Sequence, residues 1–127
     1  SLSEDEIFTL ETAAITHDIG IKISEQKYGD CTGKHQELEG PAEAKKMLTS
    51  LGYSSDVTER VCWLIAHHHT YKNIDSADHR ILVEADFLVN ADESEMSENA
   101  VETARERVFE TNTGKNLLTS IYKLPAR

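Results

Sequence analysis

The stretch Ala13-Ala14-Ile15-Thr16-His17-Asp18-Ile19-Gly20 places a histidine beside an aspartate where an apolar helical run ends at a glycine. A second acidic residue, Asp86, lies inside the apolar run Ile81-Leu82-Val83-Glu84-Ala85-Asp86-Phe87-Leu88-Val89. An unpaired carboxylate in a protein interior costs several kcal/mol or more, and a divalent cation is a common partner for a histidine and aspartate set. The sequence therefore indicates a metal centre.

The size and charge of the chain limit what it can bind. The 127 residues include 23 acidic and 13 basic side chains, which give a formal net charge of −10. This length fits one domain with a single core. Because the chain is acidic and has no basic run, we expect no nucleic-acid polymer as a partner. An anionic substrate would be repelled unless a bound cation neutralised it locally.

The sequence predicts a soluble cytoplasmic protein. No apolar stretch approaches the roughly 20 residues of a membrane span, and the acidic N-terminal residues 1–6 differ from a basic signal peptide. We therefore expect no membrane partner. Cys31 and Cys62 are isolated and form no CxxC motif. We expect both to be free thiols, with Cys62 in the core.

Apolar periodicity predicts an all-α fold, a bundle of about five to six helices without strands. Ser3 and Glu6 form a capping-box pattern at the first helix, Pro41 and Gly52 bracket another, and Ser76 and Ser97 are candidate N-caps. The predicted helices cover about 4–17, 41–51, 56–67, 76–90, 97–108 and 113–124. Residues 24–40 lack a sustained period, so a long loop is predicted there after a short helical extension.

Helical phase suggests where the first helix presents its polar residues. Asp18 follows Leu10 and Ala14 at spacings of eight and four, which predicts that it shares their buried face with Ile7. His17 is offset from that face by about 100°. Both side chains are expected to reach one cavity. The alternative is that they form a helix cap and a contact with the helix dipole.

The run His67-His68-His69 ends the helix that carries Val61, Leu64 and Ile65. For each histidine, a solvated helix C-terminus is an alternative explanation, since imidazolium groups interact favourably with the dipole there. His68 falls on the apolar stripe and is predicted to point toward the core, while His67 aligns with Trp63. His67 or His68 is the candidate to face a metal or a substrate phosphate.

Other polar residues give weaker indications. His35 lies with Lys34, Glu37 and Glu39 in the predicted loop, which would border the cavity and offer polar groups to a substrate. Ordinary surface polarity explains the same cluster. Lys22, four residues beyond Asp18, could place an ammonium near an anionic oxygen or could be solvated. His79 falls in the first turn of its helix, and we expect no catalytic role for it.

Three of these stretches together resemble the HD-domain superfamily of metal-dependent phosphohydrolases. They are Ala13 to Gly20, the later Leu64-Ile65-Ala66-His67-His68-His69, and Glu84-Ala85-Asp86-Phe87-Leu88. The resemblance runs from about residue 6 to 90. It implies that His17, Asp18 and Asp86 are metal ligands on separate helices of an all-α bundle. It also implies one HD-like domain over 1–127, with a core at about 4–109 and a C-terminal helix at about 113–124.

Two elements of the family pattern differ in this sequence. The family's first histidine, on a helix before the acidic turn, has no counterpart. We expect either a fragment that lacks this helix or a metal held by one protein ligand fewer, with water or an accessory histidine in its place. Relatives with two metals carry a histidine shortly before a glycine, where this chain has Gln36-Glu37-Leu38-Glu39-Gly40. The sequence therefore favours a single metal.

The resemblance implies a metal-dependent phosphohydrolase, in which a metal-activated water attacks phosphorus. The cation would be Mn, Mg, Fe, Co, Ni or Zn, and the substrate a small phosphate ester or a nucleotide. Asp18 would hold and orient the water, while His67, His68 and Lys22 would contact phosphate oxygens or protonate the leaving group. The alternatives are a non-catalytic HD-like module that senses a metal or nucleotide, and an acidic bundle without a site. A homo-oligomer is a further expectation.

Overall fold

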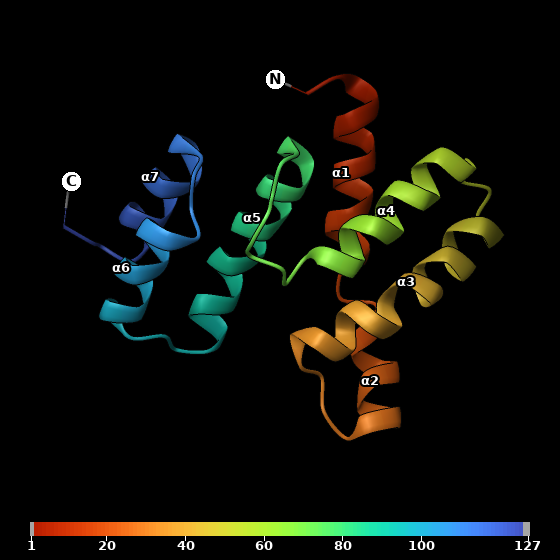
Figure 1. Cartoon of the computed structure of the whole chain (residues 1–127), viewed down its shortest axis with the longest axis horizontal. Coiled ribbons are helices and arrows are strands. Elements are labelled where there is room, and N and C mark those ends of the chain that lie inside the picture. The colour runs from red at the N-terminus through yellow and green to blue at the C-terminus, as the bar shows by residue number, and fades with distance from the viewer. Residues whose placement is uncertain (1, 126–127) are drawn as a thin grey trace. The chain divides into compact units, whose positions relative to one another are not determined.

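The structure is a computed structural model that describes residues 2–125, and its regular elements are all helical. Figure 1 shows the helices in chain order: α1 (Glu4–Thr16), α2 (Gly20–Tyr28), α3 (Gly33–Ser50), α4 (Ser55–His67), α5 (Ala77–Glu93), α6 (Glu98–Arg107) and α7 (Asn112–Ile121). No strand occurs within 2–125, so the all-α prediction is confirmed. None of these helices is long and apolar enough to cross a membrane.

The chain divides into two compact units, Ser1–Lys72 and Asn73–Arg127. The first holds α1 to α4 and the second α5 to α7. A loop from Thr70 to Ser76 links α4 to α5, and Asn73 adopts a left-handed conformation there, with φ of 58°. Each unit is described by itself below. The prediction of one domain with a core at about 4–109 stays a prediction.

Helix α1 begins as its sequence predicts, but it buries a different face. The Ser3 hydroxyl accepts from the Glu6 backbone and the Glu6 carboxylate accepts from the Ser3 backbone, which completes the capping box. The buried residues are Thr9, Thr12, Ala13 and Thr16. Each threonine hydroxyl donates to the carbonyl four residues earlier, so burial leaves no hydroxyl unpaired.

The predicted buried face with Ile7, Ala14 and Asp18 is therefore wrong. Ile7 and Ala14 are exposed, and so is Asp18. Helix α1 ends at Thr16, and residues 17–19 form a turn. Because the helical period stops before Asp18, spacing from Leu10 and Ala14 no longer sets its direction.

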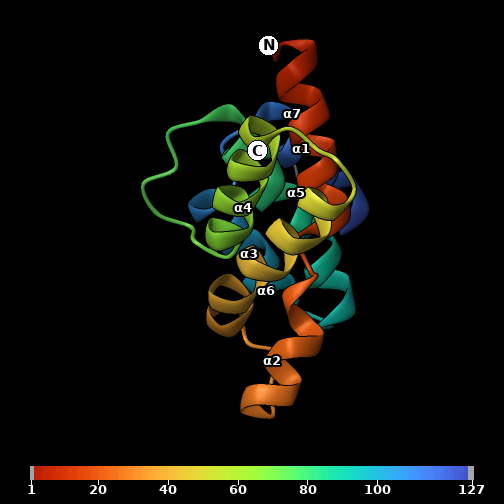
Figure 2. The same ribbon diagram turned by 90° about the vertical axis from the view of Figure 1, so that its right-hand side faces the viewer.

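The predicted loop over 24–40 is also wrong, because most of it is helix. Figure 2 shows that a separate helix, α2, follows the end of α1. Helix α3 starts at Gly33, where the Thr32 hydroxyl accepts from the His35 backbone, so Pro41 lies inside this helix. A proline there removes one helical hydrogen bond. Helix α3 nevertheless continues through Pro41, and it packs on both α2 and α4.

Glycines bring these helices into close contact, which explains why the segment looked like a loop. A Cβ on Gly20 would lie 2.8 Å from the Gly40 backbone nitrogen, and a Cβ on Gly40 would lie 2.7 Å from Cγ2 of Ile65. Neither position has room for a side chain. Gly40 shares a buried face of α3 with Gln36, Ala44 and Leu48, each four residues apart. These glycines therefore lie at tight contacts between helices.

The second unit has its own apolar core. Phe87 and Ala91 of α5 pack with residues from α6, α7 and the segments that follow these two helices: Val101, Ala104, Phe109, Leu118 and Leu124. The rings of Phe87 and Phe109 meet edge to face with centroids 5.6 Å apart. The predicted caps at Ser76 and Ser97 stand at the starts of α5 and α6. This core places α5 firmly against α7.

Replacing Gly40 by alanine should destabilise the protein through its contact with Ile65. We expect Gly40→Ala to lower the free energy of unfolding by about 1–3 kcal/mol, because the added methyl overpacks the contact. In an Ile65→Ala background, which removes Cγ2, the same change should cost at least about 0.5 kcal/mol less. Urea unfolding of both single variants and the double variant measures this coupling. Additive costs would contradict the close contact.

Candidate metal centre

His17 caps the end of α1 and is held by the helix itself. Its Nδ1 lies 2.7 Å from the Ala14 carbonyl oxygen. A carbonyl oxygen only accepts, so Nδ1 carries the proton and Nε2 of the neutral ring offers a lone pair. Histidines that bind metals commonly donate their other N–H to a backbone carbonyl in this way. The end of α1 therefore prepares Nε2 of His17 as an acceptor or ligand.

Asp18 faces that same nitrogen from the turn after α1. Its Oδ1 lies 3.3 Å from Nε2 of His17, and its side chain is 53% exposed. A carboxylate oxygen and an imidazole lone pair are both acceptors, so this approach is favourable only when a cation lies between them. That cation is either a proton on the imidazole or a metal ion. The pair therefore has the donor chemistry of a metal site that solvent can reach.

His68 and His69 lie at the end of α4 in the same unit. His68 is fully buried, as its place on the apolar stripe predicted, and its Nδ1 donates to the Ile65 carbonyl at 2.6 Å. Its ring meets that of His17 edge to face at 5.3 Å, and the rings of His68 and His69 are 4.0 Å apart. The structure thus brings the predicted residues His17, Asp18 and His68 together, and adds His69.

Gln36 and Glu37 of α3 hold this histidine cluster, a contact that was not predicted for either residue. The Gln36 amide oxygen lies 3.3 Å from Nε2 of His68 and 3.2 Å from Nε2 of His69. A Glu37 carboxylate oxygen accepts from the His69 backbone and the Thr70 hydroxyl. The spacing of Gln36, Gly40, Ala44 and Leu48 was the sequence pattern that could have placed Gln36 on a buried helix face.

Two other predicted site residues have different surroundings. The His67 ring stacks on Trp63 with centroids 4.1 Å apart, and its Nδ1 donates to the Trp63 carbonyl. The Arg60 guanidinium lies 4.4 Å from the centre of the same Trp63 ring. Lys22 is exposed in the first turns of α2 and pairs with no residue of 2–125. His67 therefore packs on its own helix.

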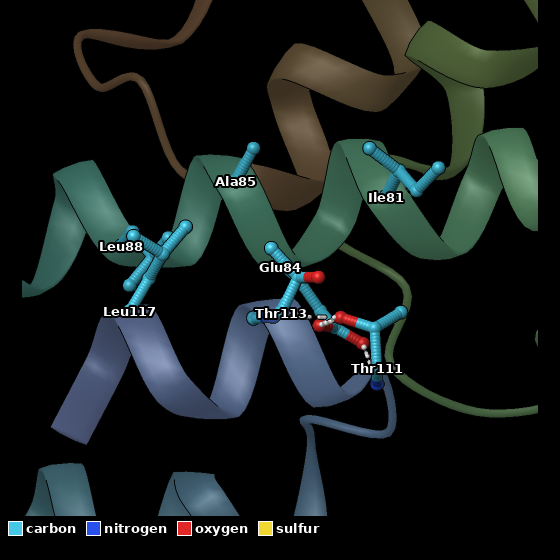
Figure 3. Close-up of a pocket in the computed structure, with 8 residues that line it drawn as sticks. Ile81, Glu84, Ala85, Leu88, Thr111, Thr113 and Leu117 are labelled. Carbon is cyan, nitrogen blue, oxygen red and sulfur yellow. Dashed lines mark hydrogen bonds between the residues drawn. The ribbon is translucent and has the colours of Figure 1, made fainter.

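The second unit carries three buried carboxylates on α5, and they have different partners. Asp78 accepts from the His79 backbone at 2.8 Å. Asp86 is 6% exposed and accepts from the Asn90 side-chain amide at 3.0 Å. Glu84 accepts from the Glu110 and Thr111 backbones and, at 2.6 Å, from the Thr111 hydroxyl. Figure 3 shows Glu84 pointing from α5 to the start of α7. Glu84 is thus satisfied by protein donors alone, whereas the family resemblance assigns the candidate ligand on this helix to Asp86.

A mostly apolar hollow of about 380 Å³ lies between α5 and α7, with Glu84 and Thr111 at one end and Leu88 and Leu117 in its wall (Figure 3). Its lining contains no histidine or aspartate. It is therefore separate from the candidate metal ligands. His79, placed correctly in the first turn of α5, is also outside this lining and is buried.

The polar cluster predicted for a substrate-facing loop instead joins α2 to α3. The Tyr28 hydroxyl donates to Glu39 at 2.6 Å, and Lys27 forms an ion pair with the same carboxylate at 3.0 Å. His35 stacks on Tyr28 with ring centroids 3.8 Å apart and contacts Asp30. Lys34 is exposed. These side chains hold two helices together, a role that ordinary surface polarity in a loop would not have.

The cysteines are both free thiols, as predicted. Cys31 is exposed. Cys62 is half-buried rather than fully in the core, and its thiol donates to the Pro41 carbonyl of α3 at 3.3 Å. Burial raises the pKa of this thiol above its ordinary value, since a thiolate is poorly solvated there. Neither cysteine belongs to the histidine cluster.

Comparison with known protein families identifies the class. The HD domain family matches residues 2–105, and the chain belongs to this family. HD domains are typically metal-dependent phosphohydrolases, and they typically bind divalent metals. Comparisons with curated proteins and with solved structures gave no significant match. The residues of this chain that could hold such a metal are His17, Asp18, His68 and His69 in the first unit and Asp86 in the second.

Removing the Glu84 carboxylate should destabilise the second unit. Glu84→Ala leaves two backbone N–H groups and a hydroxyl without their acceptor, so we expect a loss of about 2–3 kcal/mol in the free energy of unfolding. Urea unfolding checks this value, with exposed Glu93→Ala on the same helix as the control, expected within about 0.5 kcal/mol of wild type. A loss as small as the control's would show that these hydrogen bonds contribute little.

Acidification should weaken the contact between α2 and α3 through Glu39. Hydrogen bonds from Tyr28 and then Lys27 hold the pKa of Glu39 below its ordinary value of 4.5. The stabilisation is therefore full above pH 4.5 and is lost as the pH falls through the lower folded-state pKa. Glu39→Gln should lose less stability than wild type over this range in urea unfolding at stepped pH. Glu43→Gln, on the same helix, should follow wild type, and parallel curves for all three would contradict the assignment.

Proposed function

We propose that this chain binds one divalent metal through His17, Asp18 and Asp86 and hydrolyses a small phosphorylated compound, an ester or a nucleotide. The observation that carries the proposal is the approach of Nε2 of His17 to Oδ1 of Asp18 at 3.3 Å, which needs a proton or a metal ion between the two atoms. Membership of the HD domain family supports it independently.

The residues present fit a metal by their chemistry. His17 has its Nδ1 proton committed to the Ala14 carbonyl, which leaves Nε2 for a cation. Asp18 supplies a carboxylate oxygen that solvent reaches, and the family pattern assigns the third ligand to Asp86. Imidazole with carboxylates suits Mn, Fe, Co, Ni and Zn, while Mg prefers oxygen ligands. The native metal is one of these six.

A bound metal would acidify a coordinated water and polarise a phosphoryl oxygen. Asp18 would orient the attacking water through its exposed carboxylate. We retain His68, whose two nitrogens face the Ile65 carbonyl and the Gln36 amide oxygen, as a contact to an anionic oxygen of the substrate or as the proton donor to the leaving group. We retain His67 and Lys22 as contacts to the phosphate. His67 would have to leave its stack on Trp63, whereas Lys22 is exposed and needs no such change.

The charge of the chain supports a small substrate. A net charge of −10 opposes the approach of a polyanion, and this repulsion grows with the number of phosphates. A metal ion at the His17 and Asp18 pair would offset it over the dimensions of one phosphate group. We therefore propose a small phosphorylated substrate and no nucleic-acid polymer or membrane as partner. Association of the chain with itself remains part of this proposal.

Hydrolysis of p-nitrophenyl phosphate or its diester should need added Mn²⁺ and stop with chelator. Asp18→Asn keeps the shape of the side chain but removes its charge, so the rate should fall on the order of 100-fold. Asp86→Ala should lose metal, measured by elemental analysis, while circular dichroism stays unchanged. Asp75→Asn, an exposed aspartate, is the matched control, because buried His79 could perturb folding.

Full metal occupancy in Asp86→Ala would overturn its assignment as a ligand. Equal losses in Asp18→Asn and Asp75→Asn would mean that folding, and not the site, had changed. If wild type with bound metal hydrolyses no ester, nucleotide or cyclic dinucleotide, the chain is instead a non-catalytic module that senses a metal or nucleotide. Metal-independent turnover would contradict both functions.

A further inference from the structure

The side chain of Gln36 is buried and held in one orientation. Its amide nitrogen donates to the Cys31 carbonyl at 2.7 Å, and only 8% of the residue is exposed. Because a carbonyl cannot donate, this contact fixes which end of the amide is nitrogen. The amide oxygen must then be the atom directed at the histidines of α4.

Two imidazole nitrogens converge on this one oxygen. Nε2 of His69 lies 3.2 Å from it and Nε2 of His68 lies 3.3 Å from it. An amide oxygen is an acceptor, so Nε2 of His69 donates to it, whereas His68, whose Nδ1 already carries a proton, donates to it as well only as an imidazolium. His68 is held at its other nitrogen by the Ile65 carbonyl. The rotation of this ring is therefore set from two sides.

The local packing keeps His69 in the same arrangement. Its backbone N–H donates to Glu37, one residue from Gln36, and its ring lies against that of His68. A Cβ on Gly33 would lie 2.9 Å from Cγ of His69, so only a glycine at the start of α3 admits the ring. The first turns of α3 thus hold His69 by a glycine, a glutamine and a glutamate.

We propose that Gln36 is a positioning residue for His68 and His69. Its amide oxygen fixes the orientation of both rings and keeps the proton of His69 on Nε2. The proposal rests on the proposed function, in which His68 meets the substrate phosphate, and it adds His69 as a second imidazole aligned by the same atom. Gln36 acts through these rings and needs no contact with the substrate.

Side-chain ¹⁵N NMR tests the arrangement directly, because it shows which nitrogen of each imidazole carries a proton. In wild type, His69 should show a proton on Nε2. Gln36→Leu, which removes the acceptor, should convert His69 to a mixture of tautomers and shift the His68 nitrogens. Gln36→Glu keeps an acceptor oxygen and should restore the wild-type His69 pattern. Gln26→Leu, at an exposed glutamine of α2, is the matched control and should change neither ring.

Kinetics then links the arrangement to the reaction. Gln36→Leu should lower kcat about 10-fold with metal content unchanged, and Gln36→Glu should recover most of that loss. A wild-type imidazole pattern in Gln36→Leu would overturn the proposal, as would an equal kcat in wild type and in a folded Gln36→Leu. If Gln36→Leu does not fold, a changed His69 pattern in Gln36→Asn, whose shorter amide cannot reach both rings, supports the proposal and an unchanged pattern overturns it.

The two proposals fail in different ways. If wild type hydrolyses no phosphate compound, the proposed function fails and the catalytic consequence of Gln36 fails with it. The NMR comparison still decides whether Gln36 orients the rings, because it needs neither substrate nor turnover. If hydrolysis is metal-dependent but the imidazole patterns ignore Gln36, only the positioning role is overturned.

Discussion

The close contact of Gly20 with Gly40, and of Gly40 with Ile65, is the constraint on which the first unit depends. Because Gly20 and Gly40 have no side chains, α2 packs closely on α3, and α3 packs closely on Ile65 of α4. A Cβ at either glycine would push these helices apart. This close packing also positions the residues one turn earlier on α3. Gln36 and Glu37 come within hydrogen-bonding distance of the histidines that end α4. The glycine packing and the polar cluster are therefore parts of one arrangement.

Helix ends give the histidines of this unit their chemistry. The last carbonyls of a helix lack backbone partners, and a nearby imidazole can supply an N–H to them. His17, His67 and His68 each donate Nδ1 to a carbonyl three or four residues earlier. The helix thereby fixes the tautomer of each neutral ring and leaves Nε2 for an outside partner. Nε2 of His17 faces Asp18 and Nε2 of His68 faces the Gln36 amide oxygen, whereas the ring of His67 stacks on Trp63.

The rule that a buried carboxylate needs a partner holds for Glu84 of α5, and its partners are protein groups. Glu84 and Asp86 lie two residues apart in the same apolar run, and both are buried. Glu84 is satisfied by the backbone and hydroxyl at the start of α7. A helix N-terminus offers unpaired N–H groups and the positive end of the dipole, so it replaces a cation there. Burial alone therefore does not identify a carboxylate as a metal ligand.

The sequence by itself determined the helical class, the capped starts at Ser3 and Ser97 and the burial of His68, and it suggested that His17 and Asp18 belong to a family motif. These features depend on local periodicity and on side chains close together in the chain. Only the tertiary structure decided that residues 33–40 are helical, that threonines form the buried face of α1, and that Gln36 joins the histidines. The physical reason is that a glycine has the same local preference in a loop as at a helix crossing. Which one it occupies is settled by the helix that packs against it, and that helix is distant in sequence.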